Sequence, residues 1–518
     1  MAGLSAGGAL LMTSSIRRSF VSLLVASGLG AVTVTAVASG ESRRGDPASA
    51  DVAIVGATLI DGTGAAPRAS TTLLLRGDRI VAIGTTGDLA VPTGAHVIDA
   101  TGKTVIPGLA DMHVHFSFGA PAQRQPDETR QVLARQLYYG VTSILQLGAT
   151  DGSTESIRAL RAEREAGSLV APHIYGSGGH LTLPGTHPVY TIFPPAAREA
   201  ADRITAATPV DEPVNLFPMG LGISFVRNEA SVRKAVAERA AGGMDVIKIT
   251  VESGPLAFGD THPLMSVDMI RTIVDEAGKH GLPVFAHVSS PAELQASLEG
   301  GAAGVVHAVI DRPLPSEATA DLMAKRGFHV VPTLALSDGA VRFADEPGYM
   351  DDPFFRASVT DAELAALRAP GFAGAFREGW VRNANDPARA PLEALKQHRA
   401  DVLANVGMLH ARGVPIAVGT DTGNPYVYPG YSVHRELELL VQAGLTPMQA
   451  IVAGTRGGAQ MLGQQDEFGT LAVGKRADLL ILGADPLADI RNTRTIEAVI
   501  VDGKLVDRAS LLPTRDAP

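Results

Sequence analysis

The chain has 518 residues, of which 45% are hydrophobic and 19% are charged, a composition typical of a folded globular protein rather than a disordered or fibrous one. Its formal net charge of −10 argues against a nucleic-acid partner, which would need a basic face. The chain has no cysteine, so disulfides, thiolate metal ligands and a cysteine nucleophile are excluded.

The N-terminal segment predicts export. Arg17 and Arg18 precede the apolar stretch SFVSLLVASGLGAVTVTAVASG, which ends in the small-residue sequence Ala36-Val37-Ala38. A positive start, an apolar middle and a small-x-small end form the pattern of a signal peptide. We therefore expect residues 1–38 to be removed and the mature protein to be periplasmic or secreted, with no membrane contact. A transmembrane anchor is the alternative, but Gly, Ser and Thr interrupt the apolar run. Met12 is an alternative start.

Short β-type runs occupy residues 51–106, after a linker expected at 39–50, and they are separated by turn signals such as Asp61-Gly62. The same pattern returns at residues 465–508, and residues 509–518 are expected to form a tail. Two β segments at opposite ends of a chain can pair. The sequence therefore predicts a composite β-sandwich built from both chain ends.

The middle of the chain, residues 107–464, alternates apolar strand-like runs with helical patterns. The expected strands are 105–112, 141–147, 172–177, 245–250, 283–287, 303–307, 328–333 and 414–420, and the expected helices include 229–241, 266–280, 291–299, 317–326 and 433–443. This alternation predicts an α/β fold with a parallel sheet, and eight such strands fit a (β/α)8 TIM barrel. Two long connections, 178–228 and 337–400, are expected to be insertions that wall an active site or embellish the surface.

Several of these strands end in residue types that bind metals, at the barrel edge where such enzymes place their chemistry. His113 and His115 stand two apart, so both imidazoles project from the first strand to the same side. His287, His307 and Asp421 end the fifth, sixth and eighth strands. Each alone has an ordinary explanation, such as a hydrogen-bonded core histidine or an Asx turn. Their coincidence at four strand ends predicts a metal site.

Lys248 lies inside the apolar run DVIKIT, where a buried charge is costly unless it is paired or removed; alone it could pair with Asp245. Imidazole and carboxylate ligands without thiolate favour Zn²⁺, with Mn²⁺, Co²⁺, Fe²⁺ or Ni²⁺ as alternatives. Four histidines and one aspartate exceed the needs of one catalytic zinc, so we expect two divalent metal ions and an anionic bridge between them. A lysine carboxylated by carbon dioxide, N6-carboxylysine at Lys248, would supply that bridge.

Eight stretches in combination resemble the amidohydrolase superfamily, and most of all its branch of imidazolonepropionase-related enzymes that includes Xaa-Pro and Xaa-Arg dipeptidases. The resemblance covers about residues 51–508 and rests on PGLADMHVHF, GVTSILQLG, DVIKI, VFAHVSS, GVVHAVID, AVGTDTG, ELELLVQAGLTPMQAIVAGTRGGAQMLG and GTLAVGKRADLLILGADPLADI. It implies a binuclear centre with His113, His115 and Asp421 on the first metal, His287 and His307 on the second, and carboxylated Lys248 as the bridge. It also implies that Asp421 is the general base and acid, acting on a hydroxide that bridges the metals and then on the leaving group.

Departures from the family pattern concern the substrate rather than the metals. Ser289 stands where related sequences often have a second histidine, and Leu145-Gln146 replaces a common Arg-Asp pair. His187, in LPGTHP, falls where relatives carry a Gly-Gly-His stretch, so it is a candidate substrate contact, or else a loop histidine beside a proline. His434, at the start of the helix after strand eight, is a further candidate, with helix packing or solvent exposure as the alternative. Ser289 completes the candidate substrate contacts.

We therefore expect an exported metal-dependent amidohydrolase that cleaves an amide or peptide-like C–N bond in a small-molecule or short-peptide substrate, such as a dipeptide or an N-acyl amino acid. The alternatives are a lactone, carbamate or other xenobiotic hydrolase on the same site, a mononuclear deaminase of the same superfamily, and a non-catalytic relative. Lys248 counts against the deaminase, which needs no lysine on strand four, and the complete set of ligand residues counts against the non-catalytic protein. The sequence is compatible with a homo-oligomer.

Overall fold

The computed structural model describes residues 51–116, 127–150, 153–191, 193–253, 262–307, 316–357, 359–369, 392–424 and 426–512. These residues lie in one compact unit, Arg44–Pro518. The expected signal peptide, the linker expected at 39–50 and most of the tail expected at 509–518 lie outside the described residues. In the part that is described, no helix is both long and apolar enough to cross a membrane.

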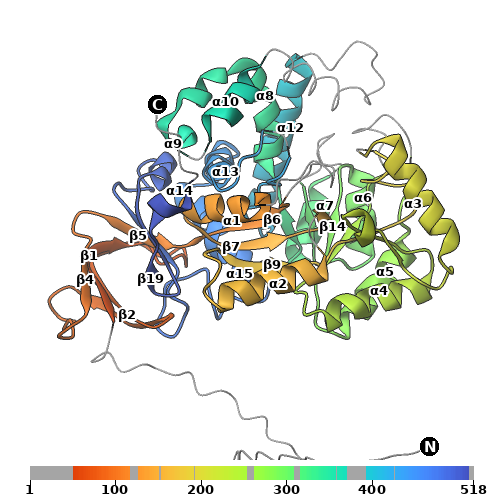
Figure 1. Cartoon of the computed structure of the whole chain (residues 1–518). Helices are drawn as coiled ribbons and strands as arrows, with labels where there is room; N and C mark the ends of the chain where they lie inside the picture. The colour runs from red at the N-terminus through yellow and green to blue at the C-terminus, as the bar shows by residue number, and fades with distance from the viewer. Residues whose placement is uncertain are drawn as a thin grey trace, which may run out of the picture. The chain divides into compact units, whose positions relative to one another are not determined.

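Strands from both ends of the chain pair in one eight-stranded sheet, and Figure 1 shows the red-to-orange N-terminal strands beside the blue C-terminal ones. Its members are β1 (Val52–Leu59), β2 (Arg68–Arg76), β3 (Arg79–Thr85), β4 (His96–Asp99), β5 (Thr104–Pro107), β17 (Leu479–Leu482), β18 (Ile496–Val501) and β19 (Lys504–Leu505). The two ends join where β17 pairs antiparallel with β5.

This sheet differs from the expected sandwich because it is one branched sheet rather than two stacked ones. The branch lies in β1, whose first half pairs with β4 and whose second half pairs with β5. A register shift between Ile54 and Ala57 separates the halves, and Gly56 between them has a φ of 83°, a conformation that glycine adopts without strain. The bulge turns the strand so that it serves two neighbours.

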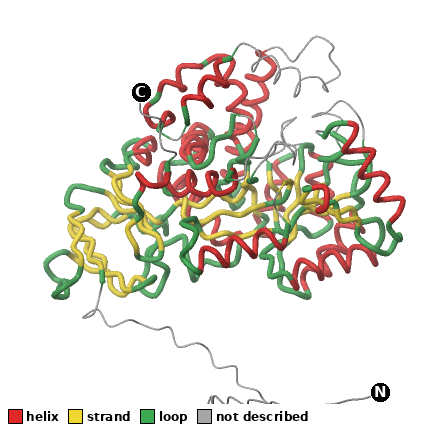
Figure 2. The backbone as a smooth tube through the Cα atoms, viewed as in Figure 1, coloured by secondary structure: helices red, strands yellow, loops and turns green. Residues whose placement is uncertain are grey.

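The middle of the chain is built from parallel strands covered by helices, as Figure 2 shows with yellow strands running between red helices. A three-stranded sheet has the order β6 (Leu109–Val114), β7 (Val141–Gln146), β9 (His173–Gly176). A second sheet has the order β11 (Val214–Asn215), β12 (Leu221–Phe225), β10 (His180–Thr182), β13 (Ile247–Thr250), β14 (Val284–His287), β15 (Gly304–Val306), β16 (His329–Val331), and β8 (Ala149–Thr150) pairs with β12. Every residue of β6, β7 and β13 is buried, as expected where helices cover both faces of a parallel sheet.

Backbone hydrogen bonds connect these two sheets at two places. The N–H of Asp245, just before β13, donates to the carbonyl of Gly176 at the end of β9 (2.9 Å). At the second place, residues 414–422 lie between β16 and β6: the N–H of Ala417 donates to Val330 (3.0 Å), and the N–H of Met112 donates to Val418 (2.9 Å).

The expected eighth strand, 414–420, is therefore in the expected place, but it is not a regular strand. It makes only isolated bridges, such as Val330 with Ile416 and Val114 with Thr422. The chain leaves the extended conformation at Asp421, whose φ is 63°. Among the described residues, the strand ladders accordingly form two sheets and not one closed ring.

The helices between the strands match the sequence pattern closely. The expected helices 229–241, 291–299 and 317–326 are confirmed by α4 (Glu229–Ala241), α6 (Pro291–Glu299) and α7 (Glu317–Arg326), while α5 (Val267–Gly278) and α13 (Tyr431–Gln442) differ by one or two residues at their ends. The other helices are α1 (Glu128–Tyr138), α2 (Thr154–Glu165), α3 (Pro195–Ala207), α8 (Leu334–Asp345), α9 (Pro353–Arg356), α10 (Asp361–Arg368), α12 (Leu392–Ala411), α14 (Pro447–Val452) and α15 (Gly458–Met461). Short 3-10 segments include η4 (Pro347–Asp351) and η6 (Ile490–Arg494).

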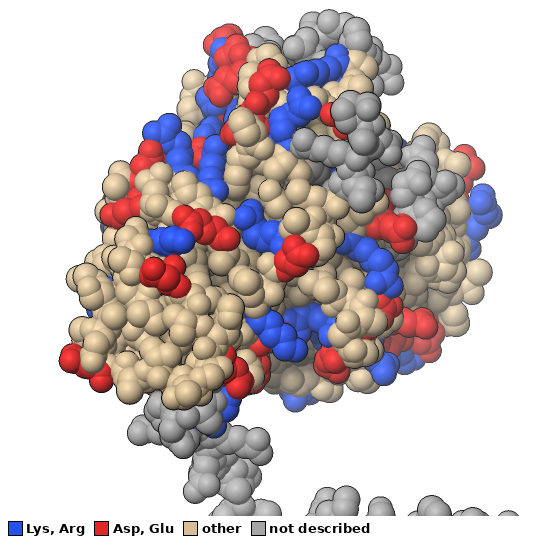
Figure 3. All heavy atoms as spheres, turned by 60° about the vertical axis from the view of Figure 1, so that its left-hand side comes forward, with Lys and Arg blue, Asp and Glu red and all other residues tan. Residues whose placement is uncertain are grey.

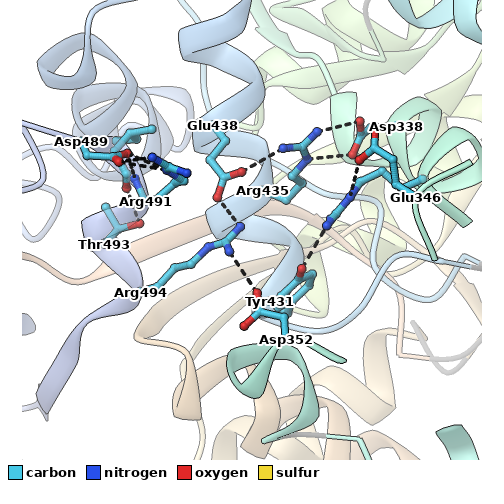
Figure 4. Close-up of polar contacts among 12 residues, drawn as sticks. Asp338, Glu346, Asp352, Tyr431, Arg435, Glu438, Asp489, Arg491, Thr493 and Arg494 are labelled. Atoms are coloured by element: carbon cyan, nitrogen blue, oxygen red, sulfur yellow. Dashed lines mark hydrogen bonds and ion pairs between the residues drawn. The ribbon is translucent and has the colours of Figure 1, made fainter. Parts of the chain in front are cut away.

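A buried chain of ion pairs ties the second long insertion to the rest of the fold (Figure 4). Arg435 of α13 contacts Asp338 of α8 and Glu438, both at 2.8 Å. Arg494 of η6 contacts Glu438 as well and lies 3.2 Å from Asp352, which precedes α9. Alternating charges thus link α8, α13, η6 and α9, and each buried charge has an opposite charge beside it, which burial requires.

The face in Figure 3 carries acidic and basic side chains interspersed with uncharged ones. No single-sign stripe crosses the described part of that face. A basic stripe is the electrostatic footprint of a nucleic-acid-binding surface.

Candidate metal centre

The carboxyl ends of the parallel strands bring the predicted ligand residues together. β6 carries His113 and is followed by His115, β14 ends at His287, His307 follows β15, and Asp421 follows the bridging segment. Because these strands are parallel, their ends meet at one edge, where barrel enzymes place their chemistry. All five side chains have little exposure to solvent.

The two histidines of the first strand point at one carboxylate oxygen. Nε2 of His115 lies 2.9 Å from Oδ1 of Asp421, and Nε2 of His113 lies 3.3 Å from the same atom. The other ring nitrogen of His115, Nδ1, lies 2.8 Å from the carbonyl oxygen of Gly148. That carbonyl can only accept, so Nδ1 carries the proton and the lone pair of Nε2 faces Asp421.

Two further histidines approach the carboxylate from the side of β14 and β15. Nε2 of His307 lies 3.9 Å from Oδ2 of Asp421 and 3.1 Å from Nδ1 of His287. Nδ1 of His307 is 2.7 Å from the hydroxyl of Thr333, which orients the ring. Nitrogen and oxygen atoms of His113, His307 and Asp421 all lie within 4.8 Å of one another, close enough to share a cation.

Lys248 lies in the middle of β13 and is completely buried, with its Nζ making no hydrogen bond to any described residue. Burial lowers the pKa of its amine to about 7, although the nearby charges of Asp421 and Glu252 act in the opposite direction. A substantial part of the amine is then neutral near neutral pH. Only the neutral amine can react with carbon dioxide to give a carbamate.

Burial also keeps the imidazoles of His113, His287 and His307 neutral. It lowers the pKa of His113 and of His287 well below the usual value for histidine, and the positive charge of Lys248 adds to the effect. The pKa of His307 is lowered in the same way, first by burial and then by His287. Burial would raise the pKa of Asp421, but the neighbouring side chains of His115, His307 and Lys248 outweigh it, so this pKa is lowered. Neutral imidazoles beside an ionised carboxylate are the ligand forms of these groups.

The backbone around Asp421 is held in an unusual conformation. Its φ of 63° is left-handed, and its N–H donates to the carbonyl of His113 (2.8 Å). The preceding residue, Thr420, donates its N–H and its hydroxyl to Asp111, which also accepts from the side-chain amide of Gln136 (3.1 Å). Burial raises the pKa of Asp111 to about 6, against the effect of these hydrogen bonds. Asp111 is thus a supporting residue of the segment that carries Asp421.

Two buried residues of the cluster, His180 and Glu252, were missed by the sequence prediction. His180 stands opposite Lys248 in the parallel register of β10 and β13; its Nδ1 is 3.2 Å from the hydroxyl of Thr250, and its Nε2 bonds to no described residue. A Cβ on Gly148 would lie 2.0 Å from the His180 ring, so only glycine fits there. The signal was present, because Gly178-Gly179-His180 is itself a Gly-Gly-His stretch.

Glu252 follows β13, and its side chain is almost completely buried. Oε2 of Glu252 lies 2.8 Å from Nε2 of His287 and 3.4 Å from Nδ1 of His187. The only sequence signal was its position, four residues after Lys248 at the same strand end.

The three candidate substrate contacts lie in different surroundings. The ring of His187 stacks on that of His287, with centroids 4.7 Å apart, so it borders the cluster. The N–H and hydroxyl of Ser289 both bond to Glu293, within the N-terminal cap of α6. His434 is buried in α13, with Nδ1 2.9 Å from the hydroxyl of Thr493 and Nε2 2.9 Å from the carbonyl oxygen of Tyr139, so both of its nitrogens are engaged away from the cluster.

The arrangement fits divalent cations. Oδ1 of Asp421 and Nζ of Lys248 are buried without a hydrogen bond of acceptable geometry to any described residue, and such atoms are costly unless something binds them. The surrounding donors are imidazole nitrogens and carboxylate oxygens, the ligands preferred by zinc and by manganese, iron, cobalt and nickel.

Comparisons with known proteins point to one family of enzymes. Residues 104–506 match the amidohydrolase family. The chain is similar to ochratoxinase of Aspergillus niger, with 26% identity over 410 residues that cover 76% of this chain and 73% of the relative. It is also similar to imidazolonepropionase of Salmonella schwarzengrund, with 25% identity over 427 residues that cover 81% and 87% of the two chains. A solved structure of a Xaa-Pro dipeptidase with bound methionine in the active site has a TM-score of 0.64 and 24% identity, covers 88% of this chain and 99% of its own, and shows a shared fold.

Proposed function

Because the chain belongs to the amidohydrolase family and is a hydrolase acting on C–N bonds, we propose that it cleaves the amide or peptide-like bond of a dipeptide or an N-acyl amino acid with the help of two divalent metal ions. The observation that carries this proposal is the convergence of Nε2 of His113, His115 and His307 on the carboxylate of Asp421. Xaa-Pro dipeptidase, whose fold the chain shares, is a peptidase by name.

In this proposal the ligands divide into two sets, with His113, His115 and Asp421 on one metal, His287 and His307 on the other, and carboxylated Lys248 between them. The unpartnered Nζ of Lys248 supports the bridge, because a buried amine with a pKa of about 7 is available to react with carbon dioxide. Zn²⁺ is the first choice from the donor set, with Mn²⁺, Co²⁺, Fe²⁺ and Ni²⁺ as alternatives.

Bound metals of this kind supply Lewis acidity, which lowers the pKa of water and polarises a carbonyl. The side chains carry the protons. Asp421, ionised in this site, takes a proton from the attacking water and later gives it to the leaving amine, as general base and then general acid. His180 lies opposite Lys248 and has an Nε2 that bonds to no described residue, so in this proposal it would bond an oxygen of the substrate.

The same proposal includes the finer features of the fold and of the cellular location. We expect a (β/α)8 barrel, because hydrogen bonds connect the two sheets at two places. Its eight strands would be β6, β7, β9, β13, β14, β15, β16 and the segment 414–420. The composite domain would comprise 51–106 and 465–508. Removal of residues 1–38 would deliver the enzyme to the periplasm or the medium, where it would meet peptides.

Metal analysis and a substrate screen test the proposal together. Purified protein should contain about two equivalents of metal per chain. It should hydrolyse members of a panel of dipeptides and N-acyl amino acids, with added zinc or manganese, faster than lactones and carbamates. A chelator should abolish the activity, and metal should restore it. About one equivalent per chain with release of ammonia from an aminated ring would instead identify a mononuclear deaminase.

A further inference from the structure

Glu252 is a second buried carboxylate beside the cluster, and the two-metal scheme gives it no role. The pairing of β13 with β14 puts Thr250 opposite His287, and the N–H of Val251 donates to the carbonyl of His287 (3.1 Å). Glu252 is the next residue, so its side chain starts from a backbone position close to the ring of His287. Oε2 of Glu252 then lies 2.8 Å from Nε2 of that ring.

The two nitrogens of His287 have different neighbours. Nε2 faces Glu252, whereas Nδ1 lies 3.1 Å from Nε2 of His307. The opposite nitrogen of His307 is next to the hydroxyl of Thr333 (2.7 Å). Nδ1 of His287 and Nε2 of His307 are therefore the pair of atoms that can turn to one cation, provided that His287 carries its proton on Nε2.

We propose that Glu252 is a positioning residue for His287: its carboxylate accepts the Nε2–H of the ring and so fixes the tautomer whose Nδ1 lone pair faces His307. Carboxylates behind metal-binding histidines act in this way, since they hold the ring and increase its basicity. The stacked ring of His187, whose Nδ1 is 3.4 Å from Oε2 of Glu252, closes the other side of the carboxylate. The inference rests on the proposed function, because it assigns His287 to the second metal.

The competing arrangement is a separate cation site made by His187, Glu252 and His287, whose ligand atoms also lie within 4.8 Å of one another. Nδ1 of His187 is, however, 2.7 Å from the hydroxyl of Thr191, a hydrogen-bonding distance. In the separate cation site, this same nitrogen would have to be a metal ligand. The geometry therefore favours Glu252 as a hydrogen-bond acceptor for an imidazole ring over Glu252 as a metal ligand.

The first experiment compares zinc binding in Glu252→Ala and Glu252→Gln, with Glu276→Ala of α5 as the control for loss of a glutamate that lies outside the cluster. Chelator competition should show that Glu252→Ala weakens the second equivalent about 10- to 100-fold and leaves the first unchanged. Glu252→Gln keeps an oxygen that accepts the Nε2–H, so it should retain most of the affinity. Unchanged binding in Glu252→Ala would overturn the proposal, as would a third equivalent in the wild type that Glu252→Gln removes.

The second experiment uses metal-free protein labelled with ¹⁵N-histidine, so its result does not depend on the proposed function. The imidazole signals should show His287 as the Nε2–H tautomer in the wild type and in Glu252→Gln, and as a mixture of tautomers in Glu252→Ala. The same tautomer in all three proteins would refute the positioning role, whatever the metal content. A protein that binds no metal but shows the expected tautomers would refute the two-metal function and keep the contact.

Discussion

The carboxylate of Asp111 holds Thr420 by two hydrogen bonds, from the backbone N–H to Oδ1 at 2.9 Å and from the hydroxyl to Oδ2 at 2.7 Å. Asp111 is on β6, two residues before His113, and Thr420 directly precedes Asp421. One buried carboxylate thus connects the strand that carries His113 and leads into His115 to the segment that carries a third proposed ligand. This contact adds to the backbone bonds that hold the segment against β6, such as the one from the N–H of Asp421 to the carbonyl of His113, because residues 414–422 form no regular strand ladder.

Replacement of Asp111 by alanine should therefore disturb the reaction more than the fold. The variant leaves the N–H and hydroxyl of Thr420 without their acceptors, at a cost of about 1–3 kcal/mol in the free energy of unfolding. A displacement of Asp421 by about 1 Å is enough to lower kcat/KM about 100-fold. Urea unfolding and steady-state kinetics measure the two effects. Equal kcat/KM in variant and wild type would show that Asp421 is positioned without Asp111.

Lys248→Ala tests the proposed bridge. Without a carbamate between the metals, the protein should lose at least one equivalent of metal, and kcat/KM should fall by about 100-fold or more. Metal loading of the wild type should improve when bicarbonate is present, because bicarbonate supplies the carbon dioxide that reacts with the neutral amine of Lys248. The matched control is Lys279→Ala, because Lys279 is an exposed lysine directly after α5. Retention of both metals and full activity in Lys248→Ala would exclude the carbamate.

The ion pairs of Figure 4 offer a stability test with an internal control. Arg435→Ala removes one of the two arginines that contact Asp338, whose side chain is 1% exposed. Because Arg399 remains 2.9 Å from that carboxylate, the loss in the free energy of unfolding should be about 2–3 kcal/mol. Arg491 pairs with Asp489 in the same view, but its side chain is 69% exposed. Arg491→Ala should therefore have little effect on stability, because an exposed ion pair is screened by water. Thermal unfolding of both variants would decide, and similar losses would mean that burial does not set the strength of these pairs.

His434 should contribute a pH dependence to stability. Burial lowers its pKa to about 3 in the folded protein, whereas the unfolded chain has the usual value of about 6.5. Between these values the unfolded chain binds a proton that the folded chain does not, so the free energy of unfolding falls as the pH falls from about 6.5 towards 3, by up to about 1.4 kcal/mol per pH unit. His434→Gln removes this titration. The stability advantage of the wild type over the variant should shrink between pH 7 and pH 5, and a constant difference would contradict the assignment.

The sequence predicted those parts of the fold that depend on periodicity. Strands such as β7 and β14 and helices such as α4 and α6 follow from short apolar runs and amphipathic patterns. Candidate ligands such as His287 and His307 were identified because they stand at the ends of predicted strands. The residues around 414–420 could not be predicted in detail, because an apolar run does not tell whether its neighbours form a ladder or single bridges.

His180 and Glu252 show a second limit. Both belong to the cluster through tertiary contacts: His180 through its register with Lys248, and Glu252 through its contact with His287. A sequence reading ranks residues by motif, and neither stood in a motif used to assign ligands. His434 shows the reverse case, because its position after strand eight made it a candidate, whereas its partners Tyr139 and Thr493 lie away from the cluster.

The pairing of β5 with β17 also determines when, during synthesis of the chain, this sheet can be completed. β5 ends at Pro107 and leads almost directly into the strand that carries His113, yet its antiparallel neighbour begins at Leu479, close to the end of the chain. During translation the earliest strands must therefore wait, with an open edge, until nearly the whole polypeptide has left the ribosome, and closure of so long a loop is slow. A chain whose first and last strands must pair therefore completes this sheet only when synthesis is nearly finished.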